Sequence, residues 1–88
     1  MLGALAKMPL DFVRGENAGR NARDAYATEH LEIASYELLR RIAQRAGDEV
    51  TAQAALEIIA EEQAMVALLE QNWDKFAELS LLEEGVTV

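Results

Sequence analysis

Three glutamates stand at positions where the helical pattern of the sequence places apolar side chains. Glu29 and Glu32 lie on the apolar side of one predicted helix, and Glu62 lies within the apolar arc of the next. The neighbours of Glu62 one turn away on this arc are apolar: Ile58, Ile59, Met65 and Val66. A carboxylate in such surroundings costs free energy unless it is paired, protonated or bound to a metal ion.

Metal binding is the first chemistry that this pattern suggests. Four-helix bundles that hold two metal ions use inward-facing glutamates, together with Glu-x-x-His pairs on two of the helices. Two divalent cations need several oxygen ligands to balance four charges, and a bundle interior excludes competing water. The predicted ligands are Glu29, Glu32 and Glu62, with Glu61 as a further candidate. The expected ion is divalent iron or manganese, and calcium or magnesium is also compatible with these oxygen ligands.

A structural role is the alternative chemistry. Arg40 falls on the same side of the first helix as Glu29, and Tyr26 and Tyr36 place two hydroxyls on that helix. The glutamates would then make only ion pairs and hydrogen bonds, and the protein would be a non-catalytic oligomerisation module. The spacing of the residues leaves both interpretations open, and it does not decide whether the protein is an enzyme.

The elements that must position these residues are two long helices. The segment 1–16 is a lead-in, nothing breaks a helix from about 18 to 46, and a second helix runs over about 49–84. This second helix is expected to bend near 72–74. The sequence therefore predicts an all-α fold, a long helical hairpin that forms a single domain over 1–88.

The ends of the predicted helices carry the residues that helix ends require. Gly47 follows the first helix as a C′ residue, and Asp48 or Thr51 can cap the second. Trp73 and Phe76 share the apolar arc of the second helix and are predicted to be core.

The first helix predicts self-association. It is apolar over a wide arc, and its hairpin partner can cover only one side of it. A chain of 88 residues also buries too little surface to tolerate a large exposed apolar face. We expect a homodimer or a larger even species that completes a four-helix bundle. The alternative covering is a missing N-terminal hairpin or a partner chain.

Composition excludes several function classes. The net charge of −8, from 16 acidic and 8 basic residues, argues against nucleic acid and anionic membranes as partners. The chain has no cysteine and one histidine, so thiolate chemistry and histidine-rich metal sites are excluded. No apolar run reaches the roughly 18 residues that a transmembrane helix needs. We expect a cytoplasmic protein.

Three segments resemble a known family. The sequence Glu-His-Leu-Glu-Ile-Ala-Ser-Tyr at 29–36 looks like the signature of the YciE/YciF family of ferritin-like proteins. Ala-Glu-Glu-Gln-Ala-Met at 60–65 and Asn-Trp-Asp-Lys-Phe at 72–76 resemble the following helix and the ending of its members. The chain resembles the C-terminal hairpin of that family, and 1–16 resembles the linker between the halves. Encapsulated ferritins, two-helix chains that dimerise into a four-helix di-iron bundle, are more weakly similar.

The resemblance implies a ferritin-like, stress-associated protein with a carboxylate metal site. Glu29 corresponds to the metal-binding glutamate of the first helix, and Glu62 or Glu61 to that of the second. The Glu-x-x-His motif of ferritin-like proteins is absent, because Met65 and Ala64 stand three residues after these two glutamates. Ferroxidase-type activity is therefore a weaker expectation than metal binding, since imidazole helps to hold iron.

Overall fold

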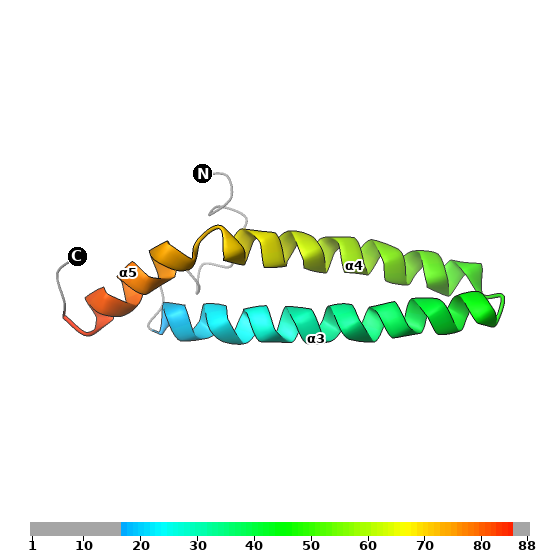
Figure 1. Cartoon of the computed structure of the whole chain (residues 1–88), viewed down its shortest axis with the longest axis horizontal. Helices are drawn as coiled ribbons and strands as arrows, with labels where there is room; N and C mark the ends of the chain where they lie inside the picture. Colours follow the sequence, from blue (N-terminus) through cyan, green and yellow to red (C-terminus); the bar gives the residue numbers. More distant parts are fainter. Residues whose placement is uncertain (1–16, 86–88) are drawn as a thin grey trace. The chain divides into compact units, whose positions relative to one another are not determined.

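The computed structural model describes residues 17–85, so the predicted lead-in over 1–16 lies outside the described residues. This range contains three helices and no strand: α3 (Ala18–Arg45), α4 (Glu49–Glu70) and α5 (Trp73–Glu83) (Figure 1). The all-α prediction is confirmed for this part of the chain. None of its helices is long and apolar enough to cross a membrane. The described chain divides into two compact units, one of residues 27–66 and one of residues 17–26 with 67–85.

The unit of residues 27–66 is a helical hairpin closed by a tight turn. Gly47 has a φ of +76°, a backbone conformation that glycine adopts without strain. The Asp48 amide donates a 2.8 Å hydrogen bond to the Ala43 carbonyl, and the Gly47 amide donates one of 3.2 Å to the Gln44 carbonyl. These two bonds form a Schellman motif, which satisfies carbonyls at the end of α3. The chain can therefore reverse direction within three residues.

Asp48 also begins α4. Its Oδ1 accepts a 3.0 Å hydrogen bond from the Thr51 amide, and its Oδ2 accepts one of 2.6 Å from the Thr51 hydroxyl. The sequence offered Asp48 or Thr51 as the cap, and the structure uses the Asp48 side chain. One short segment thus ends α3 and starts α4, which sets the register between the two helices.

Small side chains line the contact between α3 and α4 in this unit. The buried residues of α4 recur with the spacing of a helix seam, and on α3 the buried residue near the turn is an alanine. These residues are Ala43, Ala52, Ala55, Ile59 and Val66. Alanines permit close approach of two helix backbones, and the two helices run side by side here (Figure 1).

The other unit packs the start of α3 against the end of α4 and α5. Phe76 and Leu69 are its largest fully buried side chains. A Cβ atom placed on Gly19 would meet the Ser80 hydroxyl, so this glycine permits the close approach of α3 and α5. The Glu83 carboxylate accepts a 2.9 Å hydrogen bond from the Ala18 amide and thereby caps the start of α3.

The break between α4 and α5 is organised by Asn72, which is buried. Its side-chain amide donates a 2.7 Å hydrogen bond to the Leu68 carbonyl, and its own carbonyl accepts one of 3.0 Å from the Phe76 amide. The core prediction is confirmed for Phe76, which is 1% exposed, and is wrong for Trp73, which is 38% exposed. Trp73 contacts Tyr26 and Phe76 edge-on, with ring centroids 5.2 Å and 6.3 Å apart. Edge contacts leave much of its indole in solvent.

The Asp48 cap predicts a defined pH dependence of stability. Hydrogen bonds from Thr51 lower the pKa of the Asp48 carboxyl below its usual value of 3.8. The ionised cap therefore stabilises the fold fully above this value, and its contribution is lost as the pH falls through the lowered pKa. We expect Asp48→Ala to melt several degrees below the wild type at pH 7. The gap between the two melting temperatures should begin to close as the pH falls below the usual pKa and should vanish below the lowered pKa, and an equal gap at all pH values would contradict this role.

Candidate metal centre

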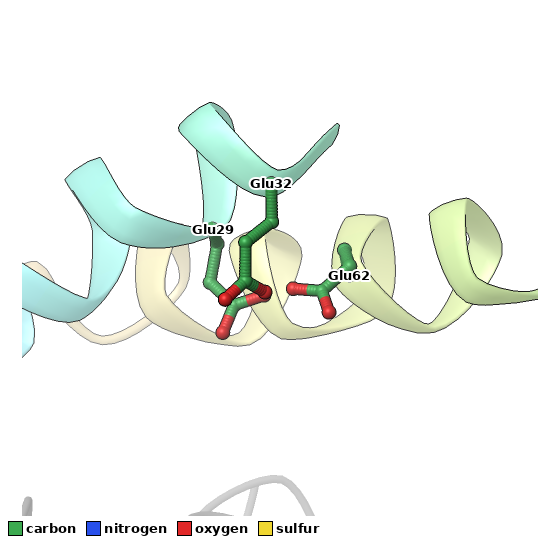
Figure 2. A group of neighbouring side chains, drawn as sticks. All are labelled: Glu29, Glu32 and Glu62. Carbon is green, nitrogen blue, oxygen red and sulfur yellow. The ribbon is translucent and has the colours of Figure 1, made fainter. Parts of the chain in front are cut away.

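The three predicted glutamates come together in the hairpin of residues 27–66. Carboxylate oxygens of Glu29, Glu32 and Glu62, one from each residue, all lie within 4.8 Å of one another. Figure 2 shows two of these side chains descending from α3 and the third approaching from α4, with their carboxylates turned toward each other. All three side chains are half-buried. We call this group the carboxylate cluster.

The helical spacing places the cluster in the seam between the helices. Glu29 and Glu32 are three residues apart, so they share one face of α3. Glu62 follows the buried Ile59 by three residues and precedes the buried Val66 by four. It therefore occupies a seam position that would ordinarily hold an apolar side chain. The rigid backbones of α3 and α4 hold these glutamates close together.

The dimensions of the cluster suit one small cation. Calcium ligands lie about 2.3–2.6 Å from the ion, so ligands on opposite sides are roughly 5 Å apart, and magnesium ligands are roughly 4 Å apart. The oxygens of the cluster lie within 4.8 Å of one another, which does not exceed the separation of opposite ligands around calcium. One cation can therefore contact all three carboxylates after small rotations of the side chains. The geometry by itself does not select among divalent ions.

No cationic or hydrogen-bonding group of residues 17–85 compensates the cluster. None of its three carboxylates has a hydrogen bond or an ion pair in this part of the chain, and Glu62 Oε2 is buried without a hydrogen-bond partner. A buried, unpartnered carboxylate oxygen carries a desolvation cost that a bound cation would offset. The donor set and the unpartnered oxygen both fit a hard divalent ion.

Arg40, which the structural alternative would pair with the glutamates of the cluster, makes its ion pair with another residue. Arg40 makes a 2.8 Å ion pair with Glu37, and Arg41 lies 3.5 Å from the same carboxylate. The hydrogen bond from Arg40 is the main cause that lowers the pKa of Glu37 below its usual value. Arg40 Nε is also buried without a hydrogen-bond partner. This arginine therefore does not neutralise the carboxylate cluster.

The tyrosines do not supply the cluster with hydrogen bonds either. The Tyr26 hydroxyl donates a 3.1 Å hydrogen bond to Glu70, and this bond, aided by burial, raises the pKa of the tyrosine. Tyr36 is half-buried, and its hydroxyl bonds to no residue of the described range. The Tyr26–Glu70 contact joins residues 44 positions apart, and no motif or spacing in the sequence indicated it.

Glu61, the fourth predicted ligand, lies outside the cluster. Its side chain is exposed, whereas that of its neighbour Glu62 is half-buried. Successive residues of a helix point about 100° apart, so only one of the two can occupy the seam. Either glutamate could correspond to the second ligand by sequence, and the fold brings only Glu62 to the other two.

The oxygen-only composition of the cluster limits its chemistry. The one histidine of the chain, His30, is exposed, whereas Glu29 beside it is half-buried and turned toward the other carboxylates. Carboxylates without imidazole suit hard ions such as magnesium, calcium and manganese.

The model of a family described as a domain of unknown function, DUF892, matches residues 7–81 of the chain. The chain belongs to the DUF892 family. This family is related to YciF, in agreement with the resemblance of the segment 29–36. No curated protein and no solved structure matches the chain. Membership in DUF892 assigns no activity to the chain.

Removing one charge from the cluster tests how the three carboxylates affect the free energy of unfolding when no metal is bound. In the presence of a chelator, Glu62→Gln should raise the free energy of unfolding by about 1 kcal/mol, because it relieves repulsion and adds a donor toward two carboxylates. Glu61→Gln is the matched control, with the same change in charge at an exposed position, and should stay within about 0.5 kcal/mol of the wild type. Urea unfolding monitored by circular dichroism measures both. Loss of stability in Glu62→Gln alone would instead show that Glu62 has a hydrogen-bonded or ion-paired partner.

Proposed function

We propose that this DUF892 protein is a ferritin-like protein that binds divalent metal ions through Glu29, Glu32 and Glu62. The observation that carries the proposal is Glu62 Oε2, buried in a helix seam beside two further carboxylates and without a hydrogen-bond partner. Three negative charges at this spacing attract a cation strongly, and the surrounding helices exclude part of its hydration shell. The role of the helices is to hold the ligands in place before the ion arrives.

The proposal includes the architecture in which the site works. The YciF-related family membership and the long α3 and α4 favour a ferritin-like four-helix bundle, which this chain completes by association with another hairpin. A bundle interior would exclude water from the carboxylate cluster and strengthen its hold on the ion. The helices of residues 27–66 would then supply half of the bundle.

The chemistry we assign is metal binding with weak redox activity. Iron and manganese fit the carboxylates, and so do calcium and magnesium. Oxygen ligands alone hold iron less firmly than a set that includes imidazole. In this protein Met65 stands where a Glu-x-x-His motif beginning at Glu62 would place its histidine. We therefore expect Fe²⁺ oxidation by O₂ to be slow.

Manganese should stabilise the wild-type protein through the cluster. At a Mn²⁺ concentration 100 times the dissociation constant, binding to the folded state alone adds about 2.7 kcal/mol to the free energy of unfolding. Wild type and Glu61→Gln should both show this rise, measured as a higher melting temperature. Glu62→Gln should lose most of it. An equal response of the three proteins would place the Mn²⁺ elsewhere on this acidic chain.

Restoring the missing imidazole should increase the redox activity. Met65→His creates a Glu-x-x-His motif from Glu62, and Met65 is half-buried, as Glu62 is. Ala64→His is the matched control, because it places a histidine three residues after the exposed Glu61. Fe²⁺ oxidation followed by absorbance should be faster in Met65→His than in wild type and unchanged in Ala64→His. If the wild type already oxidises iron rapidly, the histidine is dispensable and our assignment of weak redox activity is wrong.

A further inference from the structure

An apolar face on α3 is left uncovered within the hairpin of residues 27–66. Leu31 is 67% exposed, Leu38 62%, Ile42 55% and Leu39 39%. The first three are separated by seven and four residues, so they form one stripe along the helix. We call these four residues the leucine face. Large apolar side chains that line up in this way on a helix are typical of an interaction surface.

The leucine face adjoins the carboxylate cluster. Leu39 lies seven residues after Glu32, which places the two side chains on nearly the same line along α3. Leu39 is also the least exposed member of the leucine face, as expected for the residue nearest the seam with α4. A molecule that covered the leucine face would therefore also close over the side of Glu32.

The distribution of charge in this hairpin favours a second copy as the covering molecule. Apart from the cluster, residues 27–45 carry three arginines against one glutamate, and residues 49–66 carry three glutamates and no basic residue. A two-fold pairing that sets each copy's α3 beside the other copy's α4 brings the basic helix against the acidic one twice. A uniformly acidic or basic partner would be attracted by one helix and repelled by the other.

We propose that a second copy of this chain docks on the leucine face, and that the two copies close their carboxylate clusters into one shared metal site. The cluster of one copy suits one cation, whereas two copies together bring six carboxylates, which can balance two divalent ions. The half-buried state of these carboxylates in one hairpin is what a shared interior requires, since the second copy provides the missing cover. The shared site rests on the proposed metal function, and the docking surface does not.

Sedimentation equilibrium of the full chain tests the docking surface. We expect the wild type to be dimeric at micromolar concentration and Leu38→Glu to raise the dimer dissociation constant by about tenfold or more, because it buries a charge in the interface. The control is Val50→Glu, since Val50 is 82% exposed in the first turn of α4, where an acidic side chain is tolerated. A wild type that is monomeric at these concentrations, or equal dissociation constants for the two variants, would overturn the proposal.

Thiol labelling tests the same surface without disturbing its leucines. The chain has no cysteine, so Ser35→Cys places a single thiol on the stripe between Leu31 and Leu38, and Gln44→Cys places one on the opposite side of α3. Alkylation of Ser35→Cys should slow as the protein concentration rises through the dimer dissociation constant, whereas Gln44→Cys should react at a constant rate. Constant rates for both thiols would contradict docking on the leucine face.

The effect of Mn²⁺ on dimerisation tests the shared site independently of the docking surface. Mn²⁺ should tighten the wild-type dimer and have no such effect on Glu62→Gln. A dimer that Leu38→Glu weakens but that Mn²⁺ does not tighten would refute the shared site and keep the surface. A monomer that binds Mn²⁺ through Glu62 would refute the docking proposal and keep the metal function.

Discussion

Electrostatic repulsion among three carboxylates in a helix seam is the constraint on which this account of the protein depends. Glu29, Glu32 and Glu62 hold their oxygens within 4.8 Å of one another, and no cation of residues 17–85 neutralises them. The free energy that keeps them there comes from the hairpin, through the tight turn at Gly47 and the contact of small side chains between α3 and α4. We propose that the fold maintains this arrangement, at a cost to its own stability, as a site for a ligand, and a metal ion has the matching charge.

The same hairpin is the basis for our proposal that a second copy completes the site. Its seam buries alanines together with Ile59 and Val66, whereas the large apolar side chains of the leucine face on α3 are exposed. The leucine face and Glu32 are neighbours on that helix, so a single covering molecule would cover both. The proposed metal binding and the proposed self-association would therefore both follow from one arrangement, although each can fail without the other.

Local features could be predicted from the sequence because they depend on neighbours in the chain. The Gly47 turn, the cap at the start of α4 and the break near Asn72 follow from residue type and position. The grouping of Glu29, Glu32 and Glu62 follows from helical spacing once the two helices pair. What failed depends on packing across helices. The exposure of Trp73 does not follow from a 100° projection, which places it on the apolar arc with Phe76, because small errors in helix rotation move a residue from seam to surface. The pairing of Arg40 with Glu37 in place of the cluster depends in the same way on side-chain conformations that the sequence does not specify.

The central claim is that the carboxylate cluster binds a divalent ion, and the metal content of the protein tests it most directly. The full chain would be purified without chelator, incubated with manganese, freed of unbound ion and measured by inductively coupled plasma mass spectrometry beside Glu62→Gln and Glu61→Gln. The account predicts retained metal in the wild type and in Glu61→Gln, and its loss in Glu62→Gln. A wild type that retains no metal would contradict the account and leave the glutamates as part of a structural module.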